Sequence, residues 1–371
     1  MSSSRLYFID ALRAFAILMM LQGHFIDTLL DESHRDTGHI AFKTWEYFRG
    51  ITAPTFFTIS GLIFSYLLIK AKHSGNEAMR IRKGLLRGLM LIGIGYLLRI
   101  PIFEWIFGKF NSYFLVIDVL QCIGLSLITI VIIYRLTFKK TLLFSLLMFF
   151  LGLVIFISEP LFRNVELPNT PLVISNYFSK VNGSIFNIIP WFGYVAFGSF
   201  ISTLFYKYLK HPRFKVIIIS SFLVIGGLLI TQSSFLLIQI YSVTDCELIK
   251  EVAYYNFLFT RLGNVLILFA LFYSAEKYIK QPIVLKIGQK TLSIYVIHFI
   301  ILYGSFSVYG SFSGIGLQQL IGKTLTPWQA ILGAILFLSS ICFIAFHYTK
   351  TNEFIYGVIR ALIDRLKRVV R

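Results

Sequence analysis

The chain has 371 residues, of which 57% are hydrophobic, 17% are aromatic and only 14% are charged, and its mean hydropathy is +0.76. Because soluble domains carry about 25% charged residues, this composition excludes an ordinary soluble enzyme. Apolar stretches of about 20 residues, long enough to cross a hydrocarbon core, recur along the chain. We therefore predict an all-α fold, a polytopic integral membrane bundle of about ten transmembrane helices. The expected spans are residues 8–30, 51–69, 85–103, 114–134, 141–158, 188–206, 216–240, 256–275, 286–305 and 328–348.

The formal net charge of +18 is distributed unevenly between the loops that these spans define. With a cytoplasmic N-terminus, 24 of the 35 Lys and Arg residues lie in cytoplasmic segments and eight in outer loops. This asymmetry follows the positive-inside rule and predicts that the N- and C-termini are both cytoplasmic. Membrane topology and contact with anionic membrane lipid explain the charge, so we expect no nucleic-acid partner. We expect a multi-pass protein of the plasma (inner) membrane.

No segment between the spans is long enough for an independent soluble core. We predict one transmembrane domain over residues 1–352 and a basic amphipathic cytoplasmic tail over residues 353–371, lying on the inner leaflet. The first apolar stretch lacks the pattern of a cleavable signal peptide, so we expect it to remain in the mature protein. The three cysteines, Cys122, Cys246 and Cys342, have no metal-binding spacing, and no metal is expected.

The ionisable residues Asp10, Arg13 and His24 lie within the otherwise apolar first helix. An Asp or Arg at the centre of a transmembrane helix costs on the order of 2.5–3.5 kcal/mol on insertion scales, so such residues normally have protein partners or line a watery cavity. Asp10 and Arg13 are three residues apart and can instead neutralise one another. The first helix is therefore the first place to look for chemistry.

Polar residues of four predicted helices fall at similar depth. At a rise of 1.5 Å per residue, His24 lies about 10 Å below the outer surface, and Ser60, Gln121 and His298 lie about 10–14 Å below it. This layer predicts an enclosed cavity in the outer half of the bundle. Each residue also has a structural interpretation, since buried His and Gln side chains commonly bond between helices and a Ser beside Gly favours close helix packing.

A cationic group precedes the third predicted helix, at the inner entrance to the bundle. Its members are basic residues that anchor topology by default but can also bind a phosphorylated ligand. These residues are Arg80, Arg82, Lys83 and Arg87, and together with Arg13 they are the candidate residues for binding such a ligand.

The opening of the chain resembles integral-membrane acyltransferases. Arg5, the stretch Ile9–Arg13 and His24 are similar to a motif in which R…(I/L)DxLRxxA precedes a His at this distance. TAPTFFTISGLIFSYLL resembles the segment that follows in those proteins. Four further stretches are most like the membrane acetyltransferases related to heparan-α-glucosaminide N-acetyltransferase: LQCIGL, IPWFGYVAFG, TRLGNVL and KIGQKTLSIYVIHFIILYG.

This resemblance implies an acyltransferase that moves an acetyl group from cytosolic acetyl-CoA to a hydroxyl or amine of a sugar or cell-envelope glycan on the outer side. It implies that His24 is the motif histidine and that Asp10 and Arg13 support it. Heparan-type enzymes place an important His between the first two helices, where this chain has His39. The catalytic residue is therefore either His24 or His39. A homodimer is conceivable in this family.

A neutral, desolvated His is suited to accept the proton of the attacking hydroxyl or amine. Ser60, Gln121 or His298 can then orient the acceptor or donate to the oxyanion. The rival hypothesis is a transporter for a small polar or lipid-linked solute, because intramembrane ionisable residues mark transport pathways equally well. The absence of a visible internal repeat, and of any sign of a discontinuous helix, counts against a transporter.

Overall fold

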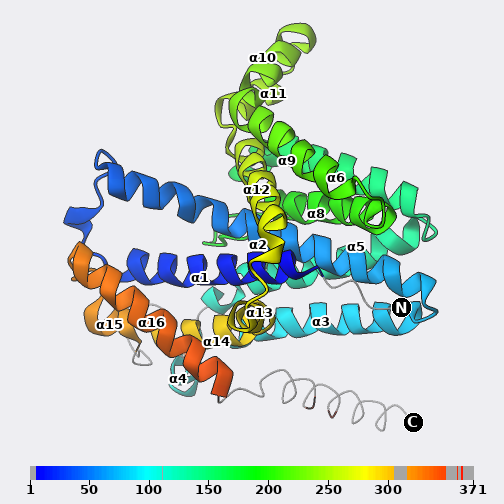
Figure 1. The fold of residues 1–371 in the computed structure, drawn as a ribbon. Coiled ribbons are helices and arrows are strands. Elements are labelled where there is room, and N and C mark those ends of the chain that lie inside the picture. Colours follow the sequence, from blue (N-terminus) through cyan, green and yellow to red (C-terminus); the bar gives the residue numbers. More distant parts are fainter. Residues whose placement is uncertain (1–5, 111, 305–315, 348–356, 358–360, 362–371) are drawn as a thin grey trace.

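In the computed structural model, residues 6–110, 112–304, 316–347, 357 and 361 are described, and their only β-type pairing is an isolated bridge between Leu30 and Leu325. The expected all-α fold is confirmed (Figure 1). The predicted tail, residues 353–371, lies outside the described residues except for positions 357 and 361. The helices are α1 (Tyr7–Leu29), α2 (Ile40–His73), α3 (Glu77–Leu97), α4 (Ile102–Ile106), α5 (Val119–Leu136), α6 (Thr141–Arg163), α7 (Leu172–Ser175), α8 (Ile188–Tyr208), α9 (Phe214–Thr231), α10 (Ser233–Thr244), α11 (Glu247–Tyr254), α12 (Phe257–Ser274), α13 (Pro282–Gln289), α14 (Thr291–Tyr303), α15 (Leu317–Ile321) and α16 (Pro327–His347).

The helices confirm a polytopic membrane protein. Within the described part of the chain, eight are long and apolar enough to cross a membrane, and the bent pair α13–α14 raises the number to nine. Helix α3 has 21 residues but carries several cations in its first half, which lower its hydropathy. It packs closely on α5, where a Cβ on Gly88 would lie 2.7 Å from the carbonyl oxygen of Gly124. With α3, the helices follow the ten expected spans in order.

Antiparallel helices divide the loops between two ends of the bundle. We call the end where α1 begins the inner face and the end where α1 finishes the outer face. At the inner face, Lys139 Nζ lies 2.8 Å from a carboxylate oxygen of Glu77, which joins the α5–α6 turn to the start of α3. At the outer face, Lys323 pairs with Glu32, which joins the segments that follow α15 and α1. The Lys- and Arg-rich turn between α5 and α6 thus lies at the inner face beside the start of α3, as the charge pattern predicts.

Helices α2 and α8 pack backbone against backbone. A Cβ on Gly61 would lie 2.0 Å from the carbonyl oxygen of Val195, and one on Gly198 would lie 2.0 Å from that of Thr58. Only glycine permits such an approach, which is how small residues hold helices together in lipid. The glycine after Ser60 therefore has a packing role.

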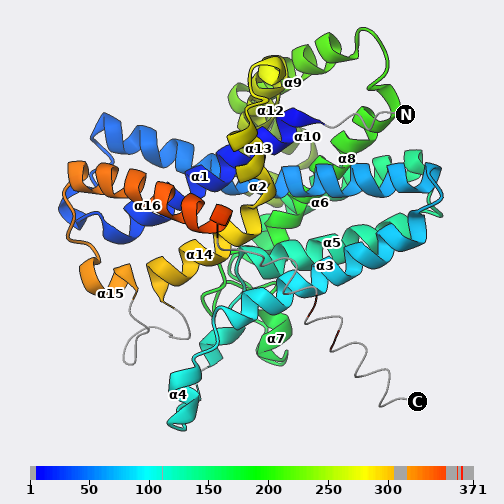
Figure 2. The ribbon, with the colours of Figure 1, turned by 60° about the horizontal axis from the view of Figure 1, so that its bottom comes forward.

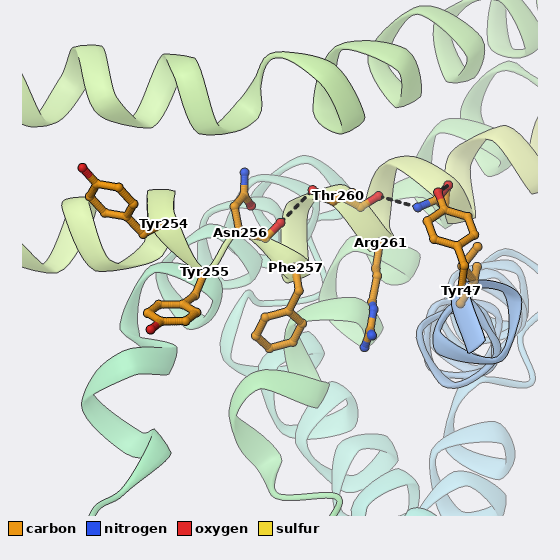
Figure 3. A pocket seen from close by; sticks show the side chains of 9 residues that line it. Tyr47, Tyr254, Tyr255, Asn256, Phe257, Thr260 and Arg261 are labelled. Carbon is orange, nitrogen blue, oxygen red and sulfur yellow. Dashed lines mark hydrogen bonds between the residues drawn. The ribbon is translucent and has the colours of Figure 1, made fainter. Parts of the chain in front are cut away.

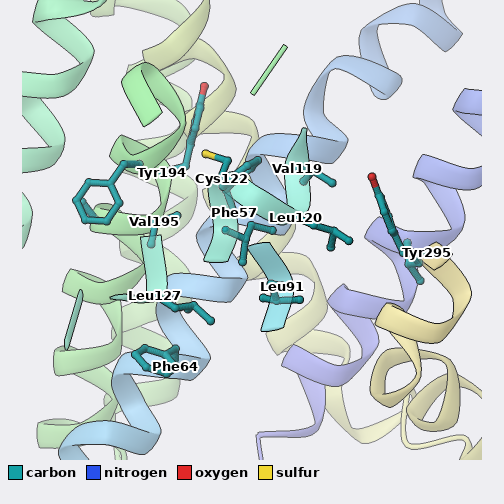
Figure 4. Packing of buried hydrophobic residues seen from close by; sticks show 14 of the residues in the cluster. Phe57, Phe64, Leu91, Val119, Leu120, Cys122, Leu127, Tyr194, Val195 and Tyr295 are labelled. Carbon is teal, nitrogen blue, oxygen red and sulfur yellow. The ribbon is translucent and has the colours of Figure 1, made fainter. Parts of the chain in front are cut away.

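Side chains from α2, α3, α5 and α8 form the centre of the core, shown in Figure 4. Phe57, Leu127 and Val195 are each almost completely buried there, with Phe64 and Leu91 beside them. This core fixes the positions of the helices whose outer ends carry the polar groups described below.

Helices α13 and α14 are separated by a 70° bend at Lys290. Helix α13 is held against the start of α1, because a Cβ on Gly288 would lie 2.1 Å from the carbonyl oxygen of Asp10. The expectation of uninterrupted helices is therefore wrong for this span. No proline marks the bend, which follows a glycine and a glutamine in the segment KIGQKT.

Helix α2 has 34 residues and begins at Ile40, well before the expected start of its span at residue 51. We call residues 40–50 the α2 extension. Trp45 Nε1 donates to Gln22 Oε1 of α1 at 2.9 Å, and Tyr47 Oη donates to Asn264 Oδ1 of α12 at 2.7 Å. The extension thus lies between α1 and α12 and contacts both.

The segment between α6 and α8 folds against the start of α5. Asn176 Nδ2 donates to the carbonyl oxygen of Leu115 at 3.0 Å, and the backbone N–H of Ile117 donates to Ser184 Oγ at 3.1 Å. Helices α4 and α7 project from the same end of the bundle (Figure 2). These bonds hold the backbone that leads into Asp118.

Candidate active site

His24 lies on α1, five residues before its outer end, and contacts α14. Its Nδ1 atom is 2.9 Å from Tyr303 Oη, and the two rings meet edge to face with centroids 6.1 Å apart. The ring of His298 lies on the same side, at a centroid distance of 5.5 Å from that of His24. The structure therefore brings together two histidines that are 274 positions apart in the sequence, and adds a tyrosine.

His298 is 1% exposed and is fixed by its own helix. Its Nδ1 atom lies 2.5 Å from the carbonyl oxygen of Tyr295. Since a carbonyl oxygen only accepts hydrogen bonds, this contact assigns the proton to Nδ1 of His298. In the neutral ring, Nε2 is then an acceptor, so His298 is suited to orient a hydroxyl or amine and unsuited to donate to an oxyanion.

A nearly buried ion pair lies beside the histidines, at the start of α5. Arg99 Nη2 is 2.8 Å from Asp118 Oδ2, and the two side chains are only 12% and 16% exposed. Asp118 Oδ1 also accepts from the backbone N–H of Val119 at 2.7 Å and so caps α5. Asp118 is close enough to interact electrostatically with His24.

Gln121 completes the capping box of α5 and is fully buried. Its Oε1 atom accepts from the backbone N–H of Asp118 at 3.2 Å, whereas its Nε2 atom has no hydrogen-bond partner among the described residues. Gly95 of α3 makes room for it, since a Cβ there would lie 2.4 Å from Gln121 Cδ. An unmet donor in a buried site is available to a substrate oxygen.

An ion-pair cluster on the outer side of His24 links α1 to the α2 extension. Asp27 lies three residues after His24, and its Oδ2 atom is 2.8 Å from Arg49 Nη2. Its Oδ1 atom is 3.7 Å from Arg35 Nη1. Arg49 also lies over the Trp45 ring at 5.5 Å. Asp27 and Arg49 both interact electrostatically with His24.

The inner half of α1 carries the second polar cluster. Arg13 Nη2 donates to Thr291 Oγ1 at 2.9 Å, beside the bend between α13 and α14. Asp10 and Arg87 lie within electrostatic range of Arg13. Arg13 and His24 are eleven residues apart, so the two clusters are about 16 Å apart along α1.

The other candidate residues for binding a phosphorylated ligand lie in the first half of α3. Arg82, Lys83 and Arg87 are exposed, and Arg80 is half-buried. Arg87 lies within electrostatic range of Arg13. Arg80, Arg82 and Lys83 lie further towards the inner face on the same helix. The structure thus places a row of cations between the inner face and Arg13.

His39 and Ser60 do not join the His24 cluster. His39 is exposed and serves as the N-cap of α2, where its Nδ1 atom accepts from the backbone N–H of Ala41 at 3.3 Å. Ser60 Oγ donates to the carbonyl oxygen of Phe56 at 2.8 Å. It lies eleven residues beyond Arg49, or about 16 Å further along α2. The depth predicted for Ser60 assumed that its helix begins at residue 51. Because α2 begins at Ile40, Ser60 lies further from the outer end of the helix than predicted.

Sequence reasoning did not select Tyr303, Asp27 or Arg49 as site residues. Tyr303 is the next-to-last residue of the stretch KIGQKTLSIYVIHFIILYG, so the resemblance contained a signal for it. Arg49 precedes the expected span and resembled an ordinary loop cation.

The chain matches a known protein family. Residues 5–243 match the family described as heparan-alpha-glucosaminide N-acetyltransferase, catalytic. The matched region contains α1 to α9 and most of α10, and therefore His24, Asp118 and the cations of α3. His298 and Tyr303 lie beyond it. No curated protein matches the chain.

Proposed function

Because the chain belongs to the heparan-α-glucosaminide N-acetyltransferase catalytic family, which is a family of membrane acetyltransferases, we propose that it moves an acetyl group from acetyl-CoA at the inner face to a hydroxyl or amine at the outer face. The acceptor class is a sugar or a cell-envelope glycan, and the membrane is the plasma (inner) membrane. The observation that carries the proposal is that His24 pairs with Tyr303 near the outer end of α1, while Arg13 lies on the inner half of the same helix.

His24 acts as the general base in this proposal. Its Nδ1–H donates to Tyr303 Oη, which directs the Nε2 lone pair at the acceptor. The acceptor oxygen or nitrogen attacks the thioester carbonyl carbon as its proton passes to Nε2. The new C–O or C–N bond forms, the C–S bond breaks, and His24 returns the proton to the coenzyme A thiolate.

The neighbouring groups have distinct proposed roles. Asp118 stabilises the imidazolium that forms on His24, and Arg99 keeps Asp118 ionised and in place. Gln121 Nε2 donates to the oxyanion, because it is a buried donor without a hydrogen-bond partner among the described residues. His298 Nε2 accepts from the acceptor group and orients it. Ser60 is the weakest candidate for any of these roles, because it lies outside the cluster.

The donor enters from the inner face. Arg80, Arg82, Lys83 and Arg87 attract the coenzyme A phosphates, and Arg13 binds the part of the donor that reaches furthest along α1. Asp10 supports Arg13 by partly balancing its charge. No metal takes part in the proposed reaction.

The test measures acetyl-CoA binding and slow acetyl-CoA hydrolysis by the purified protein in detergent. The His24→Ala variant should keep binding and lose turnover by about 10²–10⁴-fold, the usual contribution of a general base. His39→Ala is the matched control and should retain turnover, because His39 is an exposed helix cap. Full turnover in His24→Ala would overturn the mechanism. Radiolabelled acetyl on the protein after acetyl-CoA alone would favour an acetyl-His24 intermediate over direct transfer.

A transporter is the second candidate, and the bend between α13 and α14 favours it, since broken helices line the binding sites of many transporters. Flux of a polar solute into proteoliposomes, independent of acetyl-CoA, would support transport. Acetyl-CoA-dependent product formation without flux would support the enzyme.

A further inference from the structure

A long apolar groove, separate from the His24 cluster, lies between two packed pairs of helices. Helix α6 is tied to α8 by a hydrogen bond of 2.7 Å between Ser145 Oγ and Thr203 Oγ1. Helix α9 packs on α12, where a Cβ on Gly226 would lie 2.8 Å from the carbonyl oxygen of Gly263. The groove between the two pairs has a volume of about 700 Å³ and is lined mainly by apolar side chains of these four helices.

The groove is open to the hydrocarbon of the membrane. Ile217 and Ile225 of α9 line it and are 54% and 49% exposed. On α9 the lining runs from Phe214 to Leu229, which is about 22 Å at 1.5 Å per residue. One leaflet supplies half of the roughly 30 Å hydrocarbon core, so the groove is long enough for an acyl chain that starts at the membrane surface.

Helix α12 also lines a smaller pocket, of about 390 Å³, at the outer face. Figure 3 shows the first turns of α12, where Phe257 and Arg261 project to the same side and line that pocket. Phe259 and Leu262 line the groove instead, and at 3.6 residues per turn they lie on other sides of α12. The groove and the pocket are therefore separate, and the polar residues of the pocket play no part in the groove.

The inner end of the groove lies at the turn between α8 and α9. Phe205 of α8 stacks on Phe8 of α1, with ring centroids 5.5 Å apart, which places this turn beside the start of α1 and therefore at the inner face. Tyr208 and His211 line the groove there. Lys207 Nζ lies 5.0 Å from the centroid of the Tyr208 ring, so a positive charge lies beside the mouth of the groove.

The α8–α9 turn carries an excess of positive charge. Residues 207–215 read KYLKHPRFK, and residues 167–244 contain no Asp or Glu. Among the residues that the structure describes, no carboxylate lies within salt-bridge distance of Lys207, Lys210 or Arg213. The turn therefore has free capacity for an anionic group from outside the chain, at the level of the lipid headgroups.

We propose that the groove holds one acyl chain of an anionic phospholipid from the inner leaflet, with the lipid phosphate beside Lys207 and the other cations of the α8–α9 turn. The chain fills the space between the α6–α8 pair and the α9–α12 pair and joins them. Phosphatidylcholine has the same chains but no net charge, so the headgroup selects the lipid. This site does not depend on the proposed acetyl transfer.

Native mass spectrometry of the full-length protein tests the site, after exchange into detergent that contains equal amounts of phosphatidylglycerol and phosphatidylcholine. Phosphatidylglycerol should be retained at least about tenfold more often, because several cations act on one phosphate. Lysophosphatidylglycerol, which has a single chain, should displace it. sn-Glycerol 3-phosphate should not displace it, because it offers the phosphate without a chain.

Variants address the two parts of the site. The double variant Lys207→Gln, Lys210→Gln should lower the preference for phosphatidylglycerol several-fold. The double variant Arg82→Gln, Lys83→Gln removes two exposed cations of α3 and is the matched control, so its lipid preference should be unchanged. Ser221 lines the groove, so Ser221→Trp should place a large ring in it and reduce the retention of both lipids.

Other results would overturn the proposal. Equal retention of the two phospholipids, or an equal loss of preference in the α3 control, would indicate ordinary contact with the bilayer. Displacement by sn-glycerol 3-phosphate would indicate a simple phosphate site. Unchanged lipid retention in Ser221→Trp would place the lipid elsewhere, and loss of a dimer in the same variant would then identify a second copy of the chain as the occupant of the groove.

Discussion

The outer and inner ends of the bundle each hold an ion pair with the same 2.8 Å separation, but in different surroundings. The Arg99–Asp118 pair at the outer end is 12% and 16% exposed, and Asp118 also caps α5. The Lys139–Glu77 pair at the inner end is 43% and 18% exposed. The outer pair is fixed by burial and by several bonds at once. In the inner pair, Glu77 also accepts from Tyr134 Oη at 2.9 Å, but the Lys139 side chain is solvated.

The same contrast applies to the proposed chemistry. A reaction centre needs groups held in one geometry, whereas a charged entrance needs only an excess of one sign. Substitutions at the outer end should therefore have large and specific effects, and those at the inner end should be small and depend on salt.

The largest effect should follow from breaking the buried pair. Asp118→Asn leaves Arg99 charged and without its carboxylate, which should destabilise the protein by about 3 kcal/mol, at the lower end of the range because both groups are slightly exposed. Unfolding in detergent, followed by circular dichroism, measures this loss. The double variant Asp118→Asn, Arg99→Met should recover much of it. Glu77→Gln at the inner end is the matched comparison and should cost less than about 1 kcal/mol. Equal losses at the two ends would contradict the comparison.

A smaller effect should follow from removing the hydroxyl that orients His24. Tyr303→Phe keeps the ring contact and loses one hydrogen bond, so turnover should fall about tenfold while the Kd for acetyl-CoA stays unchanged. Single-turnover kinetics with a separate binding measurement separates the two quantities. A higher Kd with unchanged turnover would move Tyr303 from the reaction centre to the donor site.

The smallest effect should come from the exposed cations of α3. Arg82→Gln or Lys83→Gln should raise the KM for acetyl-CoA only two- to threefold at low salt, and the difference should disappear as screening increases, because the Debye length falls to about 8 Å at physiological ionic strength. Steady-state kinetics at two salt concentrations tests this. A tenfold effect that persists at high salt would indicate a direct, geometrically fixed phosphate contact.

Hydropathy and charge were sufficient to predict the order and approximate bounds of the spanning helices, because the cost of polar groups in hydrocarbon acts on each span separately. They could not reveal the α2 extension, whose polar residues continue the helix beyond the apolar span. The bend at Lys290 was hidden for a related reason: both halves are apolar, and no proline separates them.

Part of the candidate site could also be predicted from the sequence, because polar groups are costly in hydrocarbon and therefore rare there. His24 and His298 are rare ionisable residues within apolar stretches, so each one stood out. Tyr303 did not, because tyrosine is common near the ends of transmembrane helices. Its contact with His24 depends on the rotation of α14 about its axis, which the packing of the whole bundle determines.

The α2 extension contacts two helices at once, α1 through Arg49 on one side and α12 through Tyr47 on the other. Both contacts belong to one continuous helix, so a movement of α12 at Asn264 is also felt at Arg49 and Asp27, beside His24. If binding at one of these contacts shifts the extension, thermodynamic linkage requires that binding at the other is changed by the same factor.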